Sequence, residues 1–171
     1  MNKNHRSITK IVRLSVLLAI GVVLNYFEHI LIPVPIVPGV KFGLANTIGL
    51  VVLYYFSEKE FVAIGFLRVL MTALFTGFGF GFFISLSGWF VSTLIVVIMY
   101  QFQKLSVFGL SMLSAVAHGI GQVIMVSILY ESIYMLNYLP ILCVSGLISG
   151  ILVGLLSSEV LKRVKLVEAH E

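Results

Sequence analysis

Long intervals without a charged residue dominate this chain, and they constrain its fold more than any other feature. From Phe61 to Gln103, the single charged residue is Arg68. About 20 consecutive apolar residues are enough to cross the hydrocarbon core of a bilayer. The 171 residues are also 60% hydrophobic and 11% charged, whereas roughly a quarter of the residues in soluble domains are charged. The sequence therefore predicts an integral membrane protein.

Charged residues and helix breakers divide the chain into six predicted transmembrane helices, which form an all-α, polytopic bundle in a single membrane domain, residues 1–171. The expected helices are 11–32, 42–56, 61–77, 80–101, 105–130 and 138–158, followed by a polar, helical tail over 159–171. The prolines of the segment PVPIVPGVK, residues 33–41, end the first helix because proline cannot continue one. The glycines of Thr76–Gly81 predict the turn between the third and fourth helices.

The basic residues gather at one end of this predicted bundle. Lys41 lies alone at the other end and Arg68 lies within the membrane, while the remaining Lys and Arg residues share one end: Lys3, Arg6, Lys10, Arg13, Lys59, Lys104, Lys162, Arg163 and Lys165. Because cytoplasmic segments carry an excess of Lys and Arg, both termini are expected in the cytoplasm. We expect a multi-pass protein of the cell membrane, in a bacterial cytoplasmic membrane, and no nucleic-acid partner.

Polar side chains at membrane depth are the candidate functional residues, because they are costly in lipid unless they face a bundle interior or a cavity. The candidate substrate-binding residues come from the first, second and fifth helices: Glu28, His29, Lys41, Asn46, His118 and Gln122. Hydrogen bonds between helices, at about 0.6 kcal/mol each, would account for them individually. An outward-facing solute pocket beneath the proline-rich loop is favoured, because three helices contribute polar groups at similar depth. No cofactor or metal site is expected.

Arg68 and a strip of glycines are candidates for structural or partner contacts. Arg68 lies about seven residues, or roughly 10 Å, from the predicted cytoplasmic end of its helix, so its stem can almost reach the interface. A structural or partner role and a substrate role both stay open for it. Gly146, Gly150 and Gly154 recur at a spacing of four and predict close approach of another helix, within this bundle or from a partner subunit.

Five segments together resemble the Gx transporter family, which also carries the name heptaprenyl diphosphate synthase component I. They are KFGLAN (41–46), FLRVL (66–70), SLSG (85–88), AVAHGIGQV (115–123) and LPILCVSGLISGILVGLL (139–156). This family is similar to the S components of energy-coupling factor transporters, and the resemblance covers residues 10–157. It implies a six-helix S-component-like bundle with a solute near the outer face, a coupling transmembrane subunit and two ATPases as partners. Ser15 and Ala19 only partly match the alanine pattern used for such docking.

Two functions are carried forward from these observations. The favoured one is a membrane-embedded solute-binding subunit for uptake of a vitamin-, flavin- or quinone-related molecule. The alternative is a non-catalytic membrane component of heptaprenyl diphosphate or isoprenoid-quinone metabolism. We expect no enzymatic activity, because the chain has no Asp to hold Mg²⁺ around a diphosphate and no GxxxxGK[ST] motif to bind ATP.

Overall fold

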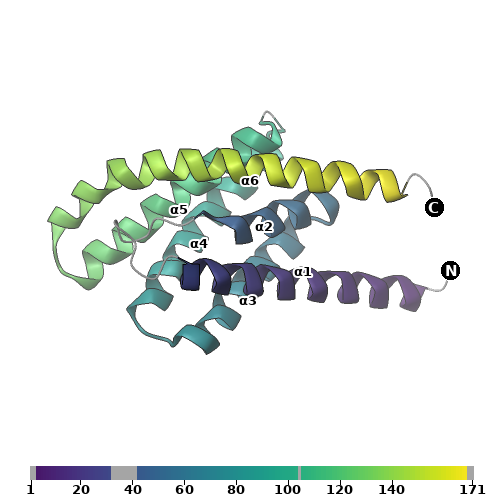
Figure 1. Cartoon of the computed structure of the whole chain (residues 1–171), viewed down its shortest axis with the longest axis horizontal. Coiled ribbons are helices and arrows are strands. Elements are labelled where there is room, and N and C mark those ends of the chain that lie inside the picture. The colour runs from purple at the N-terminus through teal and green to yellow at the C-terminus, as the bar shows by residue number, and fades with distance from the viewer. Residues whose placement is uncertain (1–2, 32–41, 104, 169–171) are drawn as a thin grey trace.

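A computed structural model describes the backbone of residues 3–31, 42–103 and 105–168, and the side chains of 7–28, 30, 42–103 and 105–164. These residues form helices and short connections (Figure 1). The helices are α1 (Lys3–Leu31), α2 (Leu44–Tyr55), α3 (Glu58–Thr76), α4 (Phe80–Gln101), α5 (Val107–Leu129), the 3-10 helix η1 (Ile133–Tyr138) and α6 (Leu139–Glu168). The turn between α3 and α4 lies within the predicted glycine-rich stretch. The predicted sixth helix and tail form one continuous helix as far as Glu168.

Four helical segments are long and apolar enough to cross a membrane: Ser7–Glu28, Phe80–Gln101, Val107–Leu129 and Ile133–Val164. By length and composition the chain is therefore a multi-pass helical membrane protein. The apolar helix α2 has only 12 residues, about 18 Å, which is shorter than the roughly 30 Å hydrocarbon core. α3 carries charges at its start and Arg68 in its interior. Neither α2 nor α3 is therefore among the four segments that qualify as a simple span.

Helices α4, α5 and α6 pack closely because glycines lie at their contacts. A Cβ atom on Gly121 would lie 2.6 Å from the carbonyl oxygen of Ser87, and one on Gly150 would lie 2.6 Å from Met112 Cα. Hydroxyl groups connect the same surfaces: Ser87 Oγ donates to the Gly121 carbonyl at 2.8 Å, and Ser111 Oγ donates to the Gly150 carbonyl at 2.7 Å. Small residues and interhelical hydrogen bonds of this kind hold helices together in lipid.

Helices α1, α2 and α3 form the other half of the bundle. Ile48 and Val52 of α2 pack with Ile64 of α3, and leucines of α1 cover them. At one end Lys10 of α1 and Glu60 of α3 form an ion pair of 2.5 Å. The hydrogen bonds from Lys10 and Ser57 lower the pKa of Glu60 to about 2, so the Glu60 carboxylate is ionised at neutral pH.

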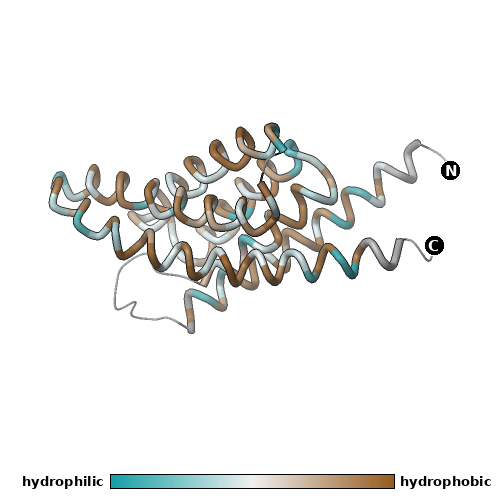
Figure 2. The backbone as a smooth tube through the Cα atoms, turned by 90° about the horizontal axis from the view of Figure 1, so that it is seen from above, coloured by the Kyte–Doolittle hydropathy of each residue, from teal (hydrophilic) through white to brown (hydrophobic). Residues whose placement is uncertain are grey.

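Both described ends of the chain project from the same end of the bundle (Figure 1). The start of α1 and the end of α6 extend beyond the shorter helices there, and hydrophilic residues interrupt the mostly hydrophobic tube near these ends (Figure 2). Many large apolar side chains on the outside of α1, α4, α5 and α6 are exposed, as lipid contact requires. The arrangement places the start of α1 and the end of α6 together, and the cytoplasmic location of the termini stays a prediction.

The close contact at Gly150 makes it sensitive to a single methyl group. Gly150→Ala should destabilise the protein by about 1–3 kcal/mol, because the backbone of Met112 must move to make room. Gly81→Ala is the matched control, since a Cβ there meets nothing within 4 Å. Thermal unfolding of both variants in detergent, followed by tryptophan fluorescence, measures the difference. Equal unfolding temperatures would show that α5 and α6 are not closely packed at this point.

Candidate functional site

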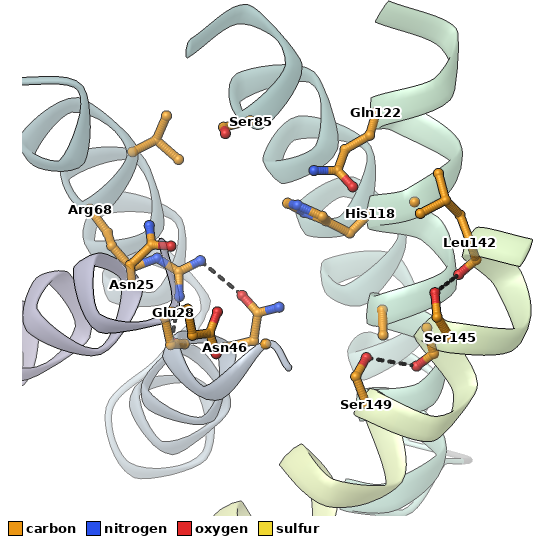
Figure 3. A pocket seen from close by; sticks show the side chains of 16 residues that line it. Asn25, Glu28, Asn46, Arg68, Ser85, His118, Gln122, Leu142, Ser145 and Ser149 are labelled. Atoms are coloured by element: carbon orange, nitrogen blue, oxygen red, sulfur yellow. Dashed lines mark hydrogen bonds between the residues drawn. The ribbon is translucent and has the colours of Figure 1, made fainter. Parts of the chain in front are cut away.

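A polar cavity of about 80 Å³ lies where the two halves of the bundle meet, and each of α1–α6 contributes to its lining. Its lining residues are Asn25, Glu28, Gly43, Ala45, Asn46, Arg68, Val69, Ser85, Ala115, His118, Gly119, Gln122, Leu142, Ser145, Gly146 and Ser149. Figure 3 shows Glu28, Asn46 and Arg68 on one side of the cavity and His118 and Gln122 on the other. Most of these side chains carry hydrogen-bonding groups, whereas many side chains on the outer surface of the bundle are large and apolar.

The start of α2 forms one wall of the cavity. Gly43 adopts a left-handed conformation, with φ of 74°, and its carbonyl oxygen accepts the Asn46 N–H at 2.8 Å. The N–H group of Leu44, the residue after Gly43, donates to the carboxylate of Glu28 on α1. The first N–H groups of a helix have no partner within it and favour a negative charge. Glu28, whose side chain is 3% exposed, therefore stabilises the beginning of α2 from a neighbouring helix.

Arg68 binds the same turn of α2 from α3. Its Nη1 donates to the Ala45 carbonyl, and its Nη2 donates to Asn46 Oδ1 at 2.9 Å. Glu28 also attracts it electrostatically. Its Nε is buried and has no acceptor among the described residues. Arg68 therefore points into the bundle and contacts α2, rather than extending along α3 to the membrane surface.

Asn25 connects this wall to α1 and was not among the predicted site residues. Asn25 Nδ2 donates to Thr72 Oγ1 at 3.0 Å, and Thr72 Oγ1 donates to the Arg68 carbonyl at 2.8 Å. The sequence did contain a signal, because Asn25 and Glu28 are three residues apart and so share a helix face. Residues at that spacing in an apolar helix are expected to face the same neighbours.

His118 and Gln122 form the opposite wall, from one face of α5. Gly88 of α4 leaves the space that they occupy, since a Cβ there would lie 2.8 Å from His118 Cε1 and 2.9 Å from Gln122 Cγ. The Gln122 side chain is 5% exposed and points into the cavity in Figure 3. An amide that faces a cavity offers both a donor and an acceptor to a polar ligand.

Ser145 and Ser149 of α6 complete the cavity. Their hydroxyls donate to the carbonyls of Leu142 and Gly146 on their own helix, both at 3.1 Å, so the oxygen lone pairs remain available as acceptors. Neither serine was predicted as a site residue, and neither was Ser85. Serines beside glycines are typical of helix packing in membranes, so their pattern alone does not indicate a cavity.

The structure brings together most of the predicted site residues. Glu28, Asn46, Arg68, His118, Gln122 and Gly146 all line the cavity. Gly150 and Gly154 instead contact Met112 and Phe108 of α5, so this glycine strip packs within the bundle. The side chain of His29 and the whole of Lys41 lie outside the described residues.

The groups that line the cavity can interact with a ligand mainly through hydrogen bonds. Glu28 and Arg68 balance each other in charge, and amides, an imidazole and hydroxyls supply the remaining polar groups. In the side chains that the structure describes, His, Cys and Glu form no group of three able to hold a metal ion. The arrangement suits a ligand with a neutral polar edge.

Fold and site together define a multi-pass helical membrane protein with a polar cavity between two three-helix halves. The chain belongs to the family described as heptaprenyl diphosphate synthase component I, whose sequence model matches residues 17–160. That segment contains every residue that lines the cavity. Searches of curated proteins and of solved structures gave no significant match. The family membership expected from the sequence is confirmed, and the similarity to S components stays a prediction.

The Glu28–Arg68 pair should behave as a unit in stability measurements. Arg68→Met should destabilise the protein by about 3–5 kcal/mol, because it removes the guanidinium's hydrogen bonds to Ala45 and Asn46 and its electrostatic attraction to Glu28. Adding Glu28→Gln should recover part of that loss. Arg163→Met, which removes an exposed arginine paired with Glu159, is the control and should cost at most about 1 kcal/mol. Unfolding temperatures in detergent give the comparison, and a double variant no more stable than Arg68→Met would exclude the coupling.

Proposed function

We propose that this chain is the solute-binding subunit of a membrane uptake system and that the polar cavity is its binding site. In this proposal all six helices lie in the membrane, both termini are cytoplasmic, and the cavity opens toward the outer face. The observation that carries the proposal is the amide of Gln122, which points into a polar cavity inside an otherwise apolar bundle. Polar groups at membrane depth are costly, and solute pathways are a common reason for them.

The size of the cavity determines how a solute would bind. Small-molecule sites measure roughly 300–1,000 Å³, whereas this cavity measures about 80 Å³. It therefore accommodates the polar end of a vitamin-, flavin- or quinone-related molecule, and the two halves of the bundle must separate to admit the rest. The contacts between the halves are those of α2 with α6 and of α3 with α4, which are the surfaces that would move.

Energy for uptake would come from a partner in this proposal. The sequence has no GxxxxGK[ST] motif, so ATP hydrolysis belongs to a separate subunit joined through a coupling transmembrane protein. The resemblance to S components supports such an assembly.

The family description favours a second candidate, a non-catalytic membrane component of heptaprenyl diphosphate or isoprenoid-quinone metabolism. We propose that the chain itself does not catalyse prenyl transfer. It has no Asp, and the closely spaced Glu58 and Glu60 are engaged with Gln101 and with Lys10 at the end of the bundle. Carboxylates available to hold Mg²⁺ would thus have to come from another subunit.

Native mass spectrometry of the gently purified protein tests the binding role. The wild type should carry a small molecule of defined mass, and Gln122→Leu should lose most of it because a ligand group would face an apolar side chain. Gln101→Leu is the matched control, since Gln101 is exposed and donates to Glu58 away from the cavity. It should retain the molecule.

Different results would count against each of the two proposed functions. A small molecule retained equally by both variants would place its site elsewhere and reject the cavity as the binding site. Absence of any small molecule, together with stoichiometric recovery of a prenyl diphosphate synthase subunit, would favour the second candidate. Unfolding temperatures of both variants verify that a lost ligand does not reflect lost structure.

A further inference from the structure

A second cavity, of about 500 Å³, lies between α1, α2 and α6 at the end of the bundle where the termini lie. It shares no lining residue with the polar cavity. Its volume falls within the roughly 300–1,000 Å³ of ligand sites. Its walls are mainly apolar and include Val12 and Val16 of α1, Val51 of α2, and Val160 and Val164 of α6. We call it the α1–α6 groove.

The walls of the α1–α6 groove expose apolar side chains that pack favourably against hydrocarbon. Val12 and Val16 are four residues apart on one face of α1 and are 56% and 54% exposed. Val160 and Val164 have the same spacing on α6. An empty groove would forfeit the dispersion contacts of these side chains, so within a bilayer apolar chains fill it.

Arginines lie beside these apolar walls. Arg13 of α1 lines the groove, and its Nη1 donates to the Tyr55 hydroxyl at 2.6 Å, which holds the guanidinium in place. Arg163 lines it from α6, with 79% of its side chain exposed. The pair of Arg163 with Glu159, 3.2 Å long and exposed, uses Nε and leaves other donors of the guanidinium for a second anion.

These arginines lie near the polar ends of two apolar helices. Arg13 lies near the start of the span Ser7–Glu28, and Arg163 lies next to the last residue of the span Ile133–Val164. Both positions correspond to the headgroup level of a bilayer, where basic pockets between helices bind anionic lipid headgroups. Guanidinium groups also match the geometry of phosphate oxygens.

We propose that the α1–α6 groove binds one anionic phospholipid. Its phosphate lies between Arg13 and Arg163, and its acyl chain lies along the valines of α1, α2 and α6. The charge at the mouth selects the headgroup, and the apolar walls distinguish a lipid from a free phosphate ion. The bound lipid would fill the space between the first and last helices, and the proposal is independent of the solute cavity.

Native mass spectrometry of the full-length protein, delipidated in a neutral detergent, tests this assignment. The protein is titrated with phosphatidylglycerol, with the zwitterionic phosphatidylcholine of the same chains, and with inorganic phosphate. One phosphatidylglycerol should bind in preference to phosphatidylcholine, and inorganic phosphate should not compete for it. Equal binding of the two lipids would overturn the proposal, and so would full competition by inorganic phosphate, which would indicate an anion site without a role for the groove.

Charge-removing variants distinguish binding at the α1–α6 groove from a general effect of net charge. Arg13→Gln/Arg163→Gln should weaken phosphatidylglycerol binding by roughly 10- to 30-fold, from the contribution of two arginines at a membrane surface. Lys59→Gln/Lys162→Gln removes the same charge from residues outside the groove and should have little effect. An equal loss of phosphatidylglycerol affinity in both double variants would show that net charge alone is responsible, and it would overturn the proposed site.

Filling the groove gives a test that keeps both arginines. Val16→Phe should lower phosphatidylglycerol affinity while it preserves the fold, because Val16 is exposed and the larger ring occupies acyl-chain space. Unchanged affinity in Val16→Phe would overturn the proposal. If this substitution instead removes a stoichiometric protein subunit from membrane extracts, and lipid binding is unaffected, the groove is a protein-docking surface and the lipid assignment is wrong.

Discussion

The attachment of the first turn of α2 by Glu28 and Arg68 is the interaction on which the rest of the structure depends. α2 has 12 residues and begins inside the bundle, so its first N–H groups would be costly in an apolar environment. Glu28 accepts the Leu44 N–H, and Arg68 binds the Ala45 carbonyl and Asn46. Glu28 thus satisfies an N–H group of the helix start, and Arg68, which Glu28 attracts electrostatically, binds the same turn. The short helix leaves room for a cavity beyond its end.

The two halves of the bundle are held together by different forces. α4, α5 and α6 approach closely through glycines, with serine hydroxyls donating across the contacts. α1, α2 and α3 are connected by side-chain hydrogen bonds, including Asn25 to Thr72, and by the ion pair of Lys10 with Glu60. The cavity lies between a closely packed half and a polar half. Closely packed neighbours thus position cavity-facing groups such as Gln122, while the other half supplies charge.

Much of the candidate site followed from the cost of polar groups in lipid. That argument selected Glu28, Asn46, His118 and Gln122, which lie on three helices and meet at the cavity. It did not select Ser145 or Ser149, because a serine beside glycines is equally typical of helix packing. It left the role of Arg68 open, because that role depends on where α2 begins. The spacing of Gly146, Gly150 and Gly154 likewise indicated close packing without identifying the neighbouring helix.

The sequence by itself determined the class of protein, the number of helices and the turn at Thr76–Gly81, because apolar length and helix breaking are local properties of the chain. Tertiary structure decided which polar groups meet. It turned Arg68 inward onto α2, placed the glycine strip against α5, and left an apolar groove between the first and last helices. These outcomes depend on contacts between residues far apart in the chain, and no local pattern specifies which faces of six apolar helices come together.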